Sequence, residues 1–301
     1  MAMGWWRSFL AATTAVALLA GAACGDEDGN DDGGRVAVVA SFAPLAEVAA
    51  RVGGDRVSVR DLTPPGAEPH DLEPTPAQVD ALERADLVVV LGGGFQPGVE
   101  ELASRRGDRA LRVLDALRDD GADARPDDPH VWLDPVLVDA LVAEVAEVLA
   151  RVDPSGADGY RRRAAGYAAQ VAGVGAAYEQ RLADCERDLL VTAHDAFGWL
   201  ARRYGLRHAA VAGLSPEAEP DPEHLAQLAD LVEREGVTTI FTESLLPRDL
   251  AETLAREAGG LRTAVLDPIE GFTEEQVDAG ADWSTVMLDN LDALAEALGC
   301  D

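Results

Sequence analysis

Lysine is absent from this 301-residue chain, so all 25 of its basic residues are arginines. Acidic residues number 55, and the formal net charge at pH 7 is -30. Such an acidic surface repels phosphate backbones, which argues against nucleic acid as a partner. It is compatible with a cationic ligand, although solubility in an extracellular medium accounts for the charge equally well.

Aromatic residues are also scarce, at 5% of the chain, so its cores must be built from aliphatic side chains. The hydrophobic share of 48% is sufficient for two domains with cores of their own. Histidine occurs only five times and cysteine three times. These few residues are the candidates for metal binding and cross-linking.

The N-terminal segment predicts export. Arg7 gives residues 1–23 a basic start, and an apolar run too short for a membrane span follows it. Small residues then precede Cys24, as at a bacterial lipoprotein processing site, so we expect Cys24 to be lipidated and to anchor the chain to the outer side of the cell membrane. Gly21 departs from the leucine usual at such sites, and secretion with a different cut is the alternative. Residues 24–34 are acidic and glycine-rich, which predicts a flexible tether.

From residue 35 onward, short apolar runs alternate with helical patterns. Strands are predicted at 36–40, 56–62, 87–91, 112–114, 189–192, 208–212, 237–242 and 262–266. Helices are predicted at 45–52, 78–84, 99–102, 135–152, 154–185, 197–204, 222–235, 247–258 and 283–298.

This alternation indicates an α/β protein with two lobes, each with a mainly parallel sheet flanked by helices. The lobes are predicted at 35–152 and 186–301, joined by one long linking helix at 153–185.

A stiff turn surrounds one of the histidines. His130 lies between Pro129 and Pro135, which restrict the backbone around it. Taken alone, such a histidine is more often structural than functional. Two others occupy comparable places, because His70 follows the strand at 56–62 and His194 directly follows the strand at 189–192.

A carboxylate, Asp267, follows the strand at 262–266 in the same way. Open parallel sheets bind ligands at the carboxyl ends of their strands, so the three histidines and Asp267 are expected to converge in a cleft between the lobes. Three imidazoles and one carboxylate predict a zinc site. A closed set of four ligands suits carriage better than catalysis; the alternative is a zinc hydrolase with Glu243 as its general base.

Several motifs carry a family resemblance: PHDLEPTP at 69–76, DPHVWLDP at 128–135, TAHDAFGWL at 192–200 and LDP at 266–268. Together they resemble the ZnuA-like or TroA-like solute-binding proteins of zinc and manganese ABC transporters. The resemblance implies a non-enzymatic, monomeric chain with two α/β lobes that carries a metal ion to a membrane permease. It also implies His70, His130, His194 and Asp267 as ligands. His194 favours zinc, because manganese carriers often have glutamate at that position; a manganese carrier is the alternative.

One segment departs from the family pattern. Zinc carriers often have a histidine-rich loop before the second ligand, whereas residues 115–128 contain six aspartates and no histidine. A solvated acidic loop is the expected explanation.

The remaining cysteines, three carboxylates and two histidines are expected to have structural or supporting roles. In an oxidising compartment Cys185 and Cys300 are expected to form a disulfide. Three carboxylates are expected to lie next to the ligands without binding the metal: Asp71, Asp195 and Glu243. The two other histidines, His208 and His224, are expected to be structural.

Overall fold

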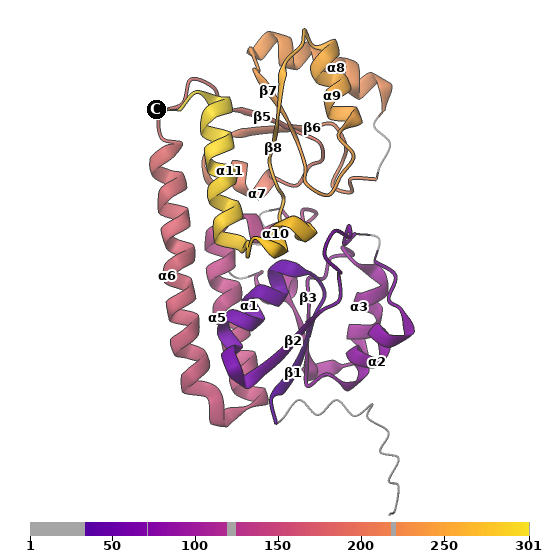
Figure 1. Ribbon diagram of the computed structural model, residues 1–301, viewed down its shortest axis with the longest axis vertical. Helices are drawn as coiled ribbons and strands as arrows, with labels where there is room; N and C mark the ends of the chain where they lie inside the picture. Colours follow the sequence, from indigo (N-terminus) through magenta and orange to yellow (C-terminus); the bar gives the residue numbers. More distant parts are fainter. Residues whose placement is uncertain (1–33, 71, 119–124, 218–220, 301) are drawn as a thin grey trace, which may run out of the picture. The chain divides into compact units, whose positions relative to one another are not determined.

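The computed structural model describes residues 34–70, 72–118, 125–217 and 221–300. The predicted signal peptide, Cys24 and almost all of the predicted tether lie outside these ranges. Within them the chain is a mixed α/β protein with two lobes (Figure 1).

The first lobe is built on one parallel sheet with the strand order β2-β1-β3-β4. Its strands are β1 (Val36–Ala40), β2 (Val57–Asp61), β3 (Leu87–Val90) and β4 (Ala110–Arg112). Its helices are α1 (Ala43–Gly53), α2 (Pro76–Arg84), α3 (Pro97–Ser104) and α4 (Val113–Ala116). Every residue of β3 is buried, as expected for a central strand covered on both faces.

The second lobe contains two parallel strand pairs, β5-β6 and β7-β8, and β5 lies beside β7. Its strands are β5 (Leu189–Thr192), β6 (Arg207–Ala210), β7 (Thr239–Thr242) and β8 (Arg262–Val265). Its helices are α7 (Gly198–Arg203), α8 (Pro222–Glu235), α9 (Asp249–Glu257), α10 (Glu274–Asp278) and α11 (Trp283–Leu298).

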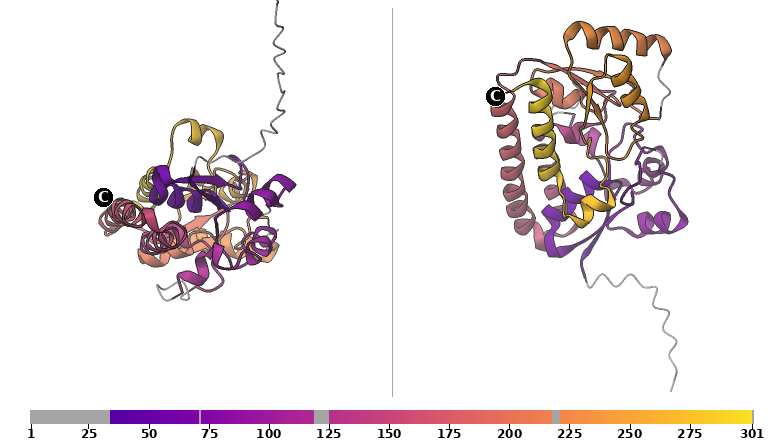
Figure 2. Two further views of the ribbon diagram at one scale, coloured as in Figure 1. Left: turned by 90° about the horizontal axis from the view of Figure 1, so that it is seen from below. Right: turned by 45° about the horizontal axis from the view of Figure 1, so that its top comes forward.

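A helical hairpin connects the lobes. The 3-10 turn η4 (Val131–Leu133) leads into α5 (Pro135–Val152), and a turn at Pro154–Gly156 leads into α6 (Ala157–Arg181). The long helix α6 packs against α5 and α1 and then against α11, and it lies beside α11 in the views of Figure 2.

One face of α6 is buried along its whole length, at Tyr160, Ala164, Tyr167, Val171, Val174 and Tyr178. Their spacing alternates between three and four residues, which is the period of an α-helix. The predicted linking helix is therefore confirmed, although its regular part ends at Arg181, four residues before Cys185.

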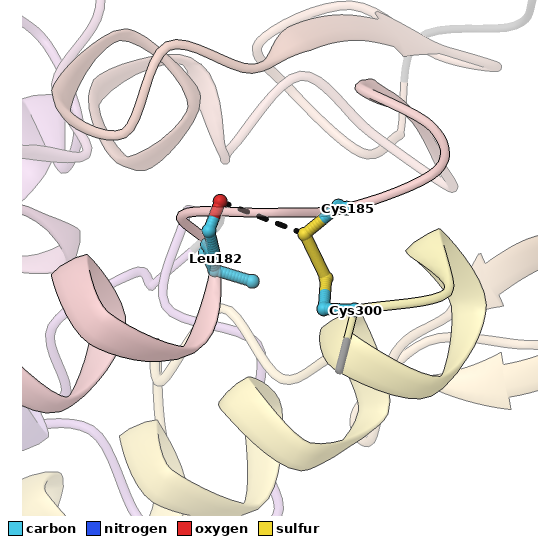
Figure 3. Close-up of a disulfide and its surroundings, with 3 residues drawn as sticks. All are labelled: Leu182, Cys185 and Cys300. Carbon is cyan, nitrogen blue, oxygen red and sulfur yellow. Dashed lines mark hydrogen bonds between the residues drawn. A yellow bond between two sulfur atoms is a disulfide. The ribbon is translucent and has the colours of Figure 1, made fainter.

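The predicted disulfide is confirmed. Cys185, after α6, is bonded to Cys300, after α11 (Figure 3). Because a disulfide sulfur carries no proton, the 3.6 Å approach of the Cys185 Sγ to the Leu182 carbonyl is a contact rather than a hydrogen bond. The bond joins the ends of two helices that pack side by side.

One local expectation was wrong, and one helix was not expected. The predicted strand at 112–114 is instead the end of β4 followed by α4, because the chain turns into a helix after Arg112. The helix α10 was not expected; its start is fixed by a capping box between Thr273 and Gln276. Among the described residues no helix is both long and apolar enough to cross a bilayer.

Candidate metal centre

The structure brings together the three histidines that the sequence placed at strand ends. His70 lies in the loop between β2 and α2, His130 immediately precedes η4, and His194 follows β5. The side chains of His130 and His194 are fully buried, and that of His70 is 9% exposed. Ring centroids are separated by 5.3 to 6.1 Å. The structure thus brings the three rings together, and their role as metal ligands stays a prediction.

The fourth member of the group is Glu270, which follows β8. Its Oε1 atom lies 3.2 Å from the Nε2 of His70, 3.1 Å from that of His130 and 3.2 Å from that of His194. The four candidate ligand atoms all lie within 4.8 Å of one another. One buried carboxylate oxygen and three imidazole nitrogens therefore face a common point.

Asp267, the expected fourth ligand, is not part of this group. Its Oδ1 accepts a hydrogen bond from the backbone N–H of Ile269, and its Oδ2 accepts from Gln276 and from the Ser244 hydroxyl. Sequence reasoning missed Glu270 because both carboxylates lie in one loop after β8. Position after a strand end could not distinguish two residues three apart.

Two further carboxylates set the tautomers of the buried histidines. Asp128 Oδ1 accepts from His130 Nδ1 at 2.8 Å, and Glu243 Oε2 accepts from His194 Nδ1 at 2.7 Å. A proton held on Nδ1 leaves the Nε2 lone pair free, and Nε2 is the atom that faces Glu270. The two rings are therefore oriented so that Nε2 can bind a metal ion once it gives up its proton.

The residues expected to support the ligands lie in different places. Glu243 supports His194 as expected, whereas Asp195 lies 3.0 Å from the Nδ1 of His208 instead. Asp71 lies outside the described residues. His224, the other histidine expected to be structural, contacts the carbonyl of Ala210.

Asp128 was not foreseen, because residues 115–128 were interpreted as a solvated acidic loop. It is only 4% exposed, and besides His130 it binds the guanidinium of Arg125. Its carbonyl accepts from Trp199 Nε1 of the second lobe at 2.9 Å. The sequence signal was its place two residues before His130. The last residue of the acidic segment thus belongs to the centre.

The charges of the centre perturb its own titration. Burial lowers the pKa of His130, but the hydrogen bonds to Asp128 and Glu270 outweigh it and raise that pKa above its ordinary value. Burial likewise lowers the pKa of His194, and the charge of Glu243 together with Glu270 raises it well above the usual range. Burial raises the pKa of Glu270, yet the three rings hold it well below normal. Without a cation, the centre therefore attracts protons.

His70 is held mainly through its backbone and by stacking. Its N–H donates to Glu68 Oε1 at 3.0 Å, and the preceding carbonyl of Pro69 accepts from Gln96 Nε2 at 3.1 Å. The ring lies 4.3 Å from that of Phe95. Burial and the charge of Glu270 raise the pKa of Glu68 to about 8.

Hydrogen bonds across the lobes surround the centre. Trp132 Nε1 donates to the Pro268 carbonyl at 2.7 Å, which connects the segment after His130 to the segment before Glu270. Arg203 of α7 binds both carboxylate oxygens of Asp134, at 2.8 and 2.7 Å. Asp134 also caps α5, so the same side chain fixes the helix behind His130.

Three imidazole nitrogens and a carboxylate oxygen form a donor set suited to a tetrahedral first-row dication. Comparison with known proteins also indicates a protein that binds a metal ion. The family described as "ZnuA: Zinc-uptake complex component A periplasmic" matches residues 38–297. The chain belongs to this family. As a component of an uptake complex, the ZnuA family is a binding family and not a family of enzymes.

Relatives of this ZnuA-family chain include the zinc-binding lipoprotein AdcA of Streptococcus pneumoniae, 32% identical over 291 residues. The alignment covers 91% of this chain and 58% of AdcA, so the chain spans little more than half the length of that relative. The high-affinity zinc uptake system protein ZnuA of Bacillus subtilis is 31% identical over 300 residues, with coverage of 92% and 93%.

A solved structure supports the fold. The Zn(II)-bound ZnuA-like domain of Streptococcus pneumoniae AdcA superposes with a TM-score of 0.75 at 33% identity. It covers 88% of this chain and 99% of that domain. The two-lobed α/β prediction is thereby confirmed.

Proposed function

We propose that this chain is the extracytoplasmic solute-binding component of a metal ABC importer, which binds one Zn²⁺ and delivers it to a membrane permease. The ligands are His70, His130, His194 and Glu270. The observation that carries the proposal is the convergence of three Nε2 atoms on the Glu270 Oε1 at 3.1 to 3.2 Å.

The charge balance of the centre favours a dication. Asp128, Glu243 and Glu270 are all at most 4% exposed, and hydrogen bonds from histidines compensate part of their charge. Buried carboxylates without full compensation are costly, and a bound dication relieves that cost while replacing the protons on the imidazoles. The negative charge of these buried carboxylates is therefore expected to attract a dication to the centre.

Zinc is favoured over the manganese alternative. Manganese prefers oxygen-rich sites of higher coordination number, whereas three imidazoles and one carboxylate suit tetrahedral zinc. The relatives AdcA and ZnuA are named for zinc as well. A zinc hydrolase is disfavoured, because both oxygens of its candidate base Glu243 already accept hydrogen bonds from His194.

We extend the proposal to the cellular setting. Residues 1–23 are removed as a signal peptide, Cys24 is lipidated, and 24–34 tether a monomeric binding unit to the membrane. The lobes span 35–152 and 186–301 with the linking helix at 153–185. A relative named a lipoprotein supports anchoring. Incorporation of labelled palmitate that is abolished by Cys24→Ser tests it; unchanged labelling refutes it.

Isothermal titration tests the metal proposal. The mature chain, stripped with a chelator, is expected to bind one Zn²⁺ per molecule, with strong loss of affinity in His130→Ala. His224→Ala is the matched control, since His224 is exposed and its ring contacts only the Ala210 carbonyl among the bonds described. A stoichiometry other than one, or equal affinities of the two variants, contradicts the proposal.

A further inference from the structure

The loop that carries Glu270 has an unusual backbone conformation directly before it. Ile269 has a φ of 56°, and among the described residues it is the only non-glycine residue with a positive φ. For a β-branched side chain this left-handed conformation is disfavoured, because Cβ comes too close to the carbonyl oxygen. Ile269 is also fully buried. Neighbouring groups must therefore hold it there.

Asp267 makes the contacts that hold this turn. Its Oδ1 accepts from the backbone N–H of Ile269 at 2.7 Å, which closes a local ring over Pro268. Its backbone N–H donates to Asn290 Oδ1 at 2.8 Å, and its carbonyl accepts from Asn290 Nδ2 at 2.7 Å. Asn290 belongs to α11, so Asp267 is fixed to a packed helix rather than to another loop.

The second carboxylate oxygen of Asp267 connects the turn to the segment that orients His194. Asp267 Oδ2 accepts from Gln276 Nε2 at 2.8 Å and from the Ser244 hydroxyl. Ser244 directly follows Glu243, which holds the His194 ring. One side chain thus connects the segment that presents Glu270 with the segment that orients His194.

We propose that Asp267 is a positioning residue: it holds Ile269 in the left-handed conformation and thereby directs the Glu270 carboxylate toward the three imidazoles. This inference rests on the proposed zinc function. Without the Asp267 acceptor, Ile269 relaxes toward a negative φ, and the direction of the following side chain changes. The affinity for zinc then falls, because part of the binding free energy is used to turn the Glu270 carboxylate back toward the imidazoles.

The first test compares Asp267→Ala with Asp267→Asn by competition titration of zinc against a chromogenic chelator. Asp267→Ala is expected to lose roughly 10- to 100-fold in zinc affinity, while still binding one ion. Asp267→Asn keeps an oxygen that accepts from the Ile269 N–H, although its NH₂ group then faces the Gln276 donor, so it is expected to lose less affinity than Asp267→Ala. Equal and severe losses in both variants would indicate a direct ligand and overturn the proposal.

The second test addresses the backbone of Ile269 itself. In the Asp267→Ala background, Ile269→Gly and Ile269→Ala both remove the buried side chain, but only glycine adopts a positive φ without a steric penalty. Ile269→Gly is expected to bind zinc roughly tenfold more tightly than Ile269→Ala. Equal affinities of this matched pair overturn the proposal, even if the parent variant is less stable.

X-ray absorption at the zinc edge separates the two proposals. If the unaltered chain binds no zinc, the proposed function fails. If it binds one zinc and Asp267→Ala binds equally well, only the positioning role fails. The expected spectrum of Asp267→Asn keeps three histidine ligands and one carboxylate oxygen, whereas Glu270→Ala loses that oxygen. Loss of the oxygen in Asp267→Asn contradicts the positioning role.

Discussion

Replacement of Glu243 by glutamine tests how far one supporting carboxylate determines metal affinity. Both Glu243 oxygens accept from His194, one from the backbone N–H at 3.0 Å and one from Nδ1 at 2.7 Å. Glutamine offers only one acceptor at these two places. Its NH₂ group then faces either the backbone N–H or the ring.

Each orientation of the glutamine has a cost for zinc binding. If NH₂ faces the ring, Nδ1 becomes an acceptor, the proton moves to Nε2, and that atom can no longer bind the ion. If NH₂ faces the backbone, it opposes the N–H donor of His194, and no water can intervene readily because Glu243 is only 2% exposed. Loss of a hydrogen bond to a charged group costs about 1.5 to 3 kcal/mol. This matches the roughly 10- to 100-fold loss typical of such outer partners, or about 1.4 to 2.7 kcal/mol.

Competition titration at one fixed pH, the same for all variants, measures this loss. Glu147→Gln is the matched control, because Glu147 lies on α5, is 50% exposed and binds only Arg161 among the bonds described. The control is expected to stay within about twofold of the unaltered chain. An affinity of Glu243→Gln within the same range would refute the proposed role of the Glu243 carboxylate.

Three further outcomes are expected. Asp128→Asn should weaken zinc binding by roughly 10- to 100-fold, by the same argument applied to His130 and measured by the same titration; an unchanged affinity would count against it. Because the pKa values of His130 and His194 are raised above 6.5 in the metal-free chain, zinc affinity should be fully present above these raised values. It should fall as pH decreases through them, by about tenfold per pH unit for each proton displaced; titrations between pH 5 and 9 would show a flat profile if the imidazoles were not ligands. Removal of the disulfide by Cys185→Ala with Cys300→Ala should lower the free energy of unfolding by up to about 4.7 kcal/mol, since the cross-link closes a loop of 115 residues. Urea denaturation checks this, and equal midpoints with and without the bond would contradict it.

The parts of the fold that could be predicted from the sequence are those with a strong local signal. The face of α6 from Tyr160 to Tyr178 repeats at helical spacing, and Val36–Ala40 forms a short apolar strand, so both were found. His70 and His194 were found because each follows a strand, and parallel strands end at the same edge of a sheet. His130 was found through the two prolines that restrict the backbone around it. The disulfide followed from the small number of cysteines.

The missing parts depend on backbone turns that leave no periodic signal. Glu270 lies three residues after Asp267, and the turn between them, with its positive φ at Ile269, leaves no signal in the sequence. Asp128 looked like one more residue of an acidic loop, although burial beside His130 gives it a separate role. Such distinctions depend on contacts between segments far apart in the sequence.

A crystal structure of the zinc-loaded chain, with anomalous data at the zinc edge, tests the central claim most directly. One strong peak is expected between His70, His130, His194 and Glu270, with each ligand atom about 2.0 to 2.2 Å from the ion. The Asp267 carboxylate is expected to remain bonded to the Ile269 N–H. A peak elsewhere, or a bond from zinc to Asp267 in place of Glu270, would contradict the account.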